Sequence, residues 1–129
     1  MLEESVADYF ELDRASPYMV LVADVREEKN GTIPAVTHVD GSARIQTVNV
    51  VDNPRFHKLL EAFGRRTDCP VLLNTSFNIR GEPIIESPEQ AYQCFMRTGL
   101  DLLVIGDYLL EKDRQPSGLE PATGRIRSS

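Results

Sequence analysis

Cysteine, histidine and long apolar runs are scarce in this sequence, and each scarcity excludes a class of protein. The 129 residues include only 2 Cys, too few for a disulfide framework, so a reducing cytoplasm is the expected compartment. No apolar run approaches the roughly 20 residues of a membrane helix, and we expect no membrane partner. Residues 1–5 are acidic and lack the apolar segment of a secretory signal, so we expect none.

Basic charge is also scarce, since 14 Lys and Arg accompany 20 Asp and Glu and the formal net charge is −6. Affinity for nucleic acid comes largely from neutralised phosphates, so no nucleic-acid partner is expected. The charge is uneven, because residues 1–43 carry −6, residues 44–100 carry +1 and residues 101–129 carry −1. The middle segment is therefore the one stretch suited to a small anion.

The composition that remains is that of one globular domain, with 41% hydrophobic and 26% charged residues. Near-continuous apolar runs predict buried strands at residues 18–25, 70–74 and 102–106, the first of them buried on both faces. We expect residues 33–39 to be extended. An alternating pattern predicts a further strand at 43–51, with Arg44, Gln46 and Val48 on one face.

Two helices have clear boundaries in the sequence. Asn53 before Pro54 predicts a helix start, and the pattern ends near Gly64. Its apolar residues recur at helical spacing and predict one buried face, made of Phe56, Leu59, Leu60 and Phe63. The capping box at residues 87–90 predicts a second helix that stops at Gly99. The expected inward stripe of this second helix is Ala91, Cys94, Phe95 and Thr98.

Strands and helices alternate over residues 43–105, which indicates an α/β fold around a central sheet. Residues 1–17 are expected to form a charged lead-in to a domain at 18–112. Residues 113–129 have no hydrophobic periodicity, and we expect a disordered tail there.

The polar loop after residue 73 is the first candidate site. It follows an apolar strand, and open α/β sheets bind ligands at such strand ends. Side-chain amides and hydroxyls, with loop N–H groups, can bind an anion there; they belong to Asn74, Thr75, Ser76 and Asn78. The alternative is a turn whose side chains satisfy their own backbone.

Arg44 is the second candidate, because it follows a turn and can direct a bidentate guanidinium at phosphate or carboxylate. The alternative is a surface salt bridge. His38 and Asp40 are weak candidates for metal ligands, because no third ligand accompanies them. We expect no metal site in this chain and interpret both residues as shaping the turn beside the ligand.

Other reactive side chains have simpler interpretations. Ser76 lacks the G-x-S-x-G context of a hydrolase nucleophile, and histidine is scarce. Cys69 and Cys94 are expected in the core. His57 stands between basic residues, and we expect it on a solvated helix face.

Four segments together carry a family resemblance: residues 16–19 (S-P-Y-M), 34–44 (P-A-V-T-H-V-D-G-S-A-R), 70–78 (P-V-L-L-N-T-S-F-N) and 81–84 (G-E-P-I). In this order and spacing they resemble the C-terminal part of the NodU/CmcH family of O-carbamoyltransferases. These enzymes carbamoylate hydroxyl groups on aminoglycosides, cephems, ansamycins and nodulation factors. The resemblance implies a YrdC-like unit, a twisted mixed sheet with flanking helices, of which this chain holds only a part.

The resemblance also implies a reaction. A YrdC-like unit would make carbamoyl-adenylate from carbamoyl phosphate and ATP, releasing pyrophosphate, with Mg²⁺ carried by ATP. Arg44 corresponds to the family's phosphate-contacting arginine, and we expect it to be catalytic. Asn74 and Ser76 match polar residues of the nucleotide and carbamoyl phosphate site, with Thr75 and Asn78 beside them. Two polyanions meet in this reaction, so guanidinium charge and fixed donors are what it requires.

Family members carry two further segments, G-P-R-A-L-G-N-R-S and K-x-R-E-x-F-R-P-F-A-P, which are not found in this sequence. The resemblance implies that they add basic residues to the site and that a Kae1-like N-terminal unit holds a metal and the acceptor. We therefore expect an excised piece or a split-gene product with little activity alone. The alternative is a non-catalytic fragment that binds nucleotide, docks on that unit, or self-associates through exposed apolar surface. An Arg44 side chain exposed in a cleft would favour a contribution to the carbamoyltransferase active site over a non-catalytic fragment.

Overall fold

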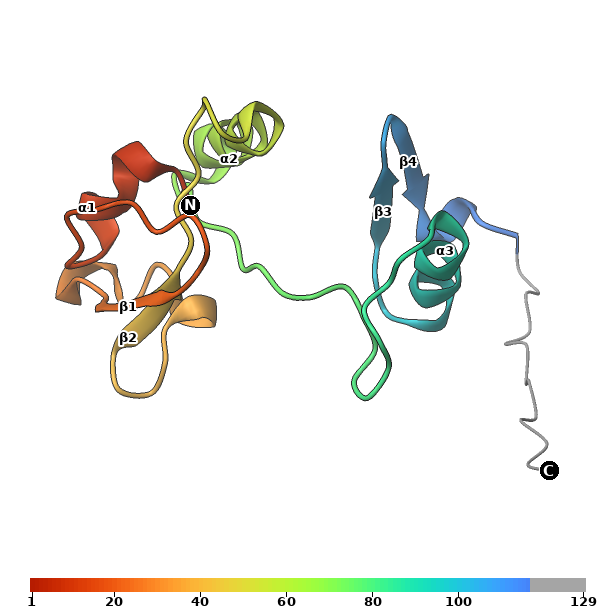
Figure 1. Cartoon of the computed structure of the whole chain (residues 1–129), viewed down its shortest axis with the longest axis horizontal. Helices are drawn as coiled ribbons and strands as arrows, with labels where there is room; N and C mark the ends of the chain where they lie inside the picture. The colour runs from red at the N-terminus through yellow and green to blue at the C-terminus, as the bar shows by residue number, and fades with distance from the viewer. Residues whose placement is uncertain (117–129) are drawn as a thin grey trace. The chain divides into compact units, whose positions relative to one another are not determined.

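The computed structural model describes residues 1–116, and these form two compact units that meet between Asn74 and Thr75 in the sequence (Figure 1). Short strands and helices occur in both, so the α/β class is confirmed. The tail expected over 113–129 lies mostly outside the described residues. No described helix has the length and apolar character needed to cross a membrane.

The N-terminal segment packs into the first unit. It forms a 3-10 turn, η1 (Glu3–Ser5), and a short helix, α1 (Val6–Tyr9). An isolated parallel bridge joins Leu2 to Val48, and an antiparallel one joins Phe10 to Val25. Apolar side chains of this segment therefore belong to the unit's main core cluster, which includes Met1, Val6, Tyr9, Phe10, Val25, Ile33, Ala43 and Ile45.

The first sheet is an antiparallel pair, β1 (Leu21–Asp24) and β2 (Ser42–Ile45). Two 3-10 turns lie between them, η2 (Glu27–Lys29) and η3 (Pro34–Val36), so the expected extended segment at 33–39 is partly helical. The expectation that residues 18–25 are buried on both faces is wrong. Only one face of β1 meets the core, since Val22 is exposed while Ala23 is half-buried. The predicted strand at 43–51 ends at Ile45.

The second helix, α2 (Pro54–Thr67), begins as expected, with Asn53 Oδ1 accepting a hydrogen bond from the Phe56 N–H at 3.2 Å. The predicted end near Gly64 is wrong by three residues. The left-handed Asp68 (φ 57°) ends the helix, and its N–H donates to the Gly64 carbonyl. Gly64 instead allows a close approach, because a Cβ there would lie 3.1 Å from Pro70 Cβ.

The predicted buried face of α2 is only partly correct. Leu60 is fully buried, but Leu59 is exposed and Phe56 and Phe63 are half-buried. The core-facing line instead runs through His57 and Leu60, and Leu60 contacts the small cluster of Leu2 and Val48. The helix is therefore rotated relative to the face that its apolar residues indicate.

No strand forms at residues 70–74, contrary to prediction, and Leu73 is largely exposed. The described strands make two separate two-stranded sheets rather than one central sheet. Among residues 1–116, the 70–74 backbone thus has no neighbouring strand with which to form a ladder.

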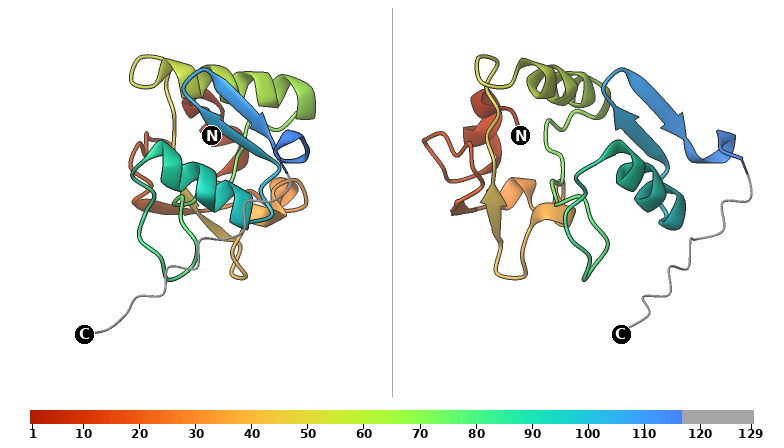
Figure 2. Two further views of the ribbon diagram at one scale, coloured as in Figure 1. Left: turned by 90° about the vertical axis from the view of Figure 1, so that its right-hand side faces the viewer. Right: turned by 45° about the vertical axis from the view of Figure 1, so that its right-hand side comes forward.

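The second unit consists of helix α3 (Pro88–Arg97) on an antiparallel hairpin, β3 (Leu102–Ile105) and β4 (Tyr108–Glu111); Figure 2 shows α3 beside β3. Ser87 Oγ accepts from the Gln90 N–H at 3.2 Å, as the capping box predicts. The predicted inward residues Ala91, Cys94 and Phe95 are buried. Thr98, the fourth, is the C-cap, and its hydroxyl donates to the Cys94 carbonyl at 2.8 Å.

The hairpin of the second unit differs from its sequence-based prediction. β4 was not predicted, and a positive φ of 58° at Gly106 allows the turn that starts it. β3 is buried on one face only, through Leu103, because no layer of residues 75–116 covers the other face. The 3-10 turn η4 (Lys112–Arg114) follows, and Lys112 Nζ donates to the carbonyls of Phe95 and Thr98 at the C-terminal end of α3.

Candidate functional site

A cavity of about 280 Å³ opens in the first unit, between β2, the turn that precedes it and residues 71–74. Its polar lining includes His38, Arg44, Gln46 and Asn74. Its apolar lining includes Ile45 from β2 and Val71 and Leu72 from the following segment. The cavity thus combines an apolar wall with an arginine and several other hydrogen-bonding side chains.

Arg44 lies on the outward face of β2, where Ala43 and Ile45 point into the core. Its side chain is exposed and has no hydrogen bond or ion pair with any residue from 1 to 116. The Arg44 guanidinium is therefore not paired with a carboxylate of the described chain. This excludes, within those residues, the surface salt bridge that was the alternative from sequence.

Asn74 is held at the cavity by Gln46. Asn74 Nδ2 donates to Gln46 Oε1 at 2.8 Å, and Gln46 Nε2 donates to the Pro17 carbonyl at 3.0 Å. Gln46 was not singled out from sequence as a site residue. The alternating pattern could have indicated it, because Gln46 lies two residues after Arg44 and so shares its face of the predicted strand.

The turn before β2 is fixed by its own side chains. Asp40 Oδ1 accepts from the Ser42 N–H at 3.0 Å and from Ser42 Oγ at 2.7 Å. These two hydrogen bonds hold the pKa of the Asp40 carboxyl below its ordinary value. His38 Nδ1 lies 3.0 Å from Ser42 Oγ, and Gly41 turns the chain with φ +84°.

The remaining predicted site residues, Thr75, Ser76 and Asn78, belong to the second unit. Ser76 Oγ donates to Asn78 Oδ1 at 2.7 Å, and Asn78 Nδ2 donates to the Glu82 carbonyl at 3.0 Å. Two of these side chains therefore bind within their own loop. Arg44 and Asn74 are the predicted site residues that line the cavity of the first unit.

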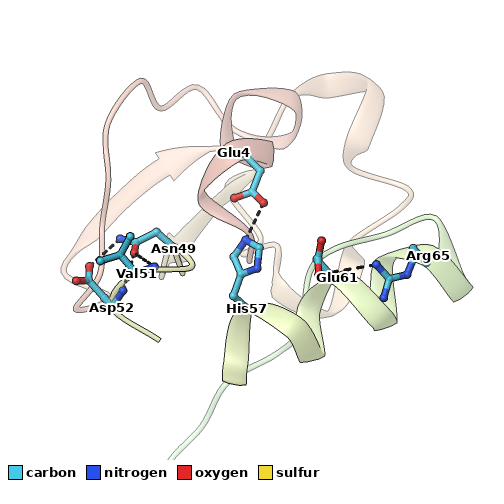
Figure 3. A network of polar contacts seen from close by, with 7 residues as sticks. All are labelled: Glu4, Asn49, Val51, Asp52, His57, Glu61 and Arg65. Atoms are coloured by element: carbon cyan, nitrogen blue, oxygen red, sulfur yellow. Dashed lines mark hydrogen bonds and ion pairs between the residues drawn. The ribbon is translucent and has the colours of Figure 1, made fainter. Parts of the chain in front are cut away.

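The histidine and cysteine predictions have mixed outcomes. Cys94 is buried and Cys69 is half-buried against the core cluster. The expectation that His57 is solvated is wrong, because it is buried and its Nε2 lies 2.8 Å from Glu4 Oε1 (Figure 3). No three His, Cys, Asp or Glu side chains among the described residues gather closely enough to hold a metal.

The model of one protein family, described as carbamoyltransferase C-terminus, matches residues 1–112. The chain belongs to this family. An uncharacterized protein of Synechocystis sp. is 52% identical over 90% of this chain and 22% of its own length. Nodulation protein NolO of Bradyrhizobium diazoefficiens is 45% identical over 92% of this chain and 22% of its own length.

A third relative, the 3'-hydroxymethylcephem-O-carbamoyltransferase of Amycolatopsis lactamdurans, is 40% identical over 81% of this chain and 20% of its own length. The chain therefore spans about a fifth of the curated relatives that it matches. The resemblance to the C-terminal region of the NodU/CmcH family is confirmed.

Proposed function

We propose that this carbamoyltransferase C-terminus helps to form carbamoyl-adenylate from carbamoyl phosphate and ATP, before a separate Kae1-like unit transfers the carbamoyl group to an acceptor hydroxyl. The observation that carries the proposal is the exposed Arg44 guanidinium at the cavity, with no partner among residues 1–116. An unpaired arginine with a planar fork of donors suits a phosphate oxygen pair.

The size and lining of the cavity favour carbamoyl phosphate over a whole nucleotide. Its volume of about 280 Å³ is just below the roughly 300–1,000 Å³ usual for ligand pockets. Asn74 and Gln46 provide amide groups that suit a small polar ligand with both donors and acceptors. In this proposal carbamoyl phosphate occupies the cavity, and the parts of ATP that do not fit there contact other segments of the protein.

The overall chemistry must balance. Carbamoyl phosphate, ATP and one water give carbamoyl-adenylate, pyrophosphate and inorganic phosphate. In the proposed sequence, water first cleaves carbamoyl phosphate into carbamate and inorganic phosphate. The carbamate oxygen then bonds to the α-phosphorus of ATP as the bond to pyrophosphate breaks. Arg44 would bind the phosphate oxygens on which negative charge is concentrated, and no protein nucleophile is needed. Mg²⁺ is part of the ATP substrate, held by its phosphates and by water.

The test is calorimetric titration of the full chain with carbamoyl phosphate and then with MgATP, beside an Arg44→Ala variant. Arg14→Ala is the matched control, because Arg14 is an exposed arginine of the same unit that pairs with Asp13 and does not line the cavity. Carbamoyl phosphate binding that disappears only in Arg44→Ala would support the proposal. Absence of binding, or equal binding by all three proteins, would contradict it.

A second candidate function, docking, is favoured by the outward face of the β3–β4 hairpin. Leu102, Val104 and Leu109 share that face and are all more than half exposed. The matched relatives carry most of their length outside the aligned region. We infer that the partner that covers the hairpin face belongs to this additional N-terminal region. Co-purification with that N-terminal region of a relative, lost in Val104→Lys, would support docking; full retention in Val104→Lys would contradict it.

A further inference from the structure

His38 reaches the same cavity as Arg44, from the turn that leads into β2. Two backbone hydrogen bonds hold that turn, from His38 N–H to the Ser42 carbonyl at 2.7 Å and from Gly41 N–H to the His38 carbonyl at 3.0 Å. The imidazole is thus carried by a closed turn rather than by a free loop. Arg44 lies two residues after Ser42 on β2, so a change in the conformation of the turn would also change the position of the Arg44 side chain.

The hydrogen bonds of this turn favour one tautomer of the His38 imidazole. An ionised carboxylate only accepts hydrogen bonds, so the single hydroxyl hydrogen of Ser42 goes to Asp40 Oδ1, 2.7 Å away. The Ser42 oxygen can then only accept from His38 Nδ1 at 3.0 Å. A neutral imidazole that carries its proton on Nδ1 has a lone pair on Nε2.

That lone pair is unused within the described chain. Nε2 of His38 has no hydrogen-bond partner among residues 1–116, and the ring is exposed. Carbamoyl phosphate carries an NH₂ group, which is a donor that the Arg44 guanidinium cannot bind because arginine has no acceptor. A site that recognises the carbamoyl group therefore needs an acceptor beside its phosphate contact.

We propose that His38 Nε2 accepts a hydrogen bond from the carbamoyl NH₂ group and so makes the site selective for carbamoyl phosphate over acyl phosphates of the same shape. This inference rests on the proposed function. Asp40 and Ser42 act as positioning residues, because they hold the tautomer in which Nε2 is the acceptor. Acetyl phosphate is the discriminating probe, since a methyl group replaces the NH₂ group and cannot donate.

The tautomer is tested without ligand. Long-range ¹H–¹⁵N NMR at neutral pH distinguishes the two ring nitrogens, and the only other imidazole is that of His57. The expected His38 pattern has the proton on Nδ1, and in Ser42→Ala the two tautomers become mixed. A proton on Nε2 in the unmodified chain would overturn the inference and leave the assignment of Arg44 intact.

Selectivity is tested by titrating the full chain with carbamoyl phosphate and acetyl phosphate. We expect His38→Asn, whose amide group can replace Nδ1 but not Nε2, to weaken carbamoyl phosphate binding about five- to tenfold and leave acetyl phosphate unchanged. His38→Gln, which can place an oxygen near Nε2, should retain part of the selectivity. Equal losses for both ligands in His38→Asn, or none, would overturn the inference.

The same titrations separate this inference from the proposed function. If Arg44→Ala abolishes binding but His38→Asn leaves the ratio of the two affinities unchanged, only the role of His38 is wrong. If the unmodified chain binds neither acyl phosphate, the proposed function fails and the selectivity of His38 fails with it.

Discussion

His57 Nε2 lies 2.8 Å from Glu4 Oε1 and joins the first turn of α2 to the N-terminal 3-10 turn η1, 53 residues earlier (Figure 3). The imidazole is almost fully covered, whereas the Glu4 side chain is 56% exposed. Because the carboxylate can only accept, Nε2 is the donor in this contact. The pair links the two segments on which the small cluster of Leu2, Val48 and Leu60 depends.

We expect His57→Ala to destabilise the first unit by about 1–3 kcal/mol, because it removes a buried ring and a hydrogen bond. Glu4→Ala should cost less than about 1 kcal/mol, since the partner carboxylate is largely solvated. Urea unfolding followed by circular dichroism measures both. Lys58→Ala, at the next and exposed position of α2, is the matched control and should change little. Equal effects at positions 57 and 58 would show that the contact carries no stability.

Two consecutive leucines of α2 provide a second comparison. Leu60 has no exposed surface, while Leu59 is 55% exposed. Leu60→Ala should therefore destabilise the first unit by about 2–5 kcal/mol through lost burial and a residual cavity. Leu59→Ala should fall within about 1 kcal/mol of the unmodified chain, because its side chain is already largely in water. A larger loss at Leu59 would mean that this side chain is covered in solution, for example by a second copy of the chain.

Asp40 provides a prediction of pH dependence. Its hydrogen bonds from Ser42 Oγ and the Ser42 N–H lower the pKa of the carboxyl from the ordinary value of 3.8. The ionised carboxylate therefore stabilises the folded state above about pH 4, and this contribution is lost as the pH falls through the folded pKa. Carboxyl ¹³C NMR titration of Asp40 should give a midpoint below 3.8 that rises in Ser42→Ala. A midpoint unaffected by Ser42→Ala would contradict the described turn.

Local rules predicted the helix starts well and the sheets poorly. Asn53 and Ser87 act within three residues of their targets, so their caps could be identified from sequence alone. A strand depends on a partner that is distant in sequence, and residues 70–74 have no such partner in the described chain. The apolar runs of β1 and β3 predict buried strands, but an apolar run does not show whether one or both faces of a strand are covered by other elements.

In the candidate site, too, features set by nearby residues could be predicted and contacts between residues distant in sequence could not. The position of Arg44 at a cavity agrees with its charge, its place after a turn and its family motif, and its role in anion binding stays a prediction. The bond between Gln46 and Asn74 could not be predicted, because it joins residues 28 positions apart through side-chain rotamers. The burial of His57 was missed for a related reason, since its Glu4 partner lies 53 positions away.

Gln46 therefore permits a test of the cavity that is independent of Arg44 and His38. Gln46→Glu retains the oxygen that accepts from Asn74 but adds a negative charge to the cavity that Arg44 lines. We expect affinity for carbamoyl phosphate and for acetyl phosphate to fall alike, by about three- to tenfold at low salt, because the charge repels both anions. Added salt should reduce the loss. The measurement is the same titration at two ionic strengths, with Gln93→Glu on the exposed face of α3 as the matched control. A loss for one ligand only, or an equal loss in the control, would mean that the anion does not bind beside Gln46.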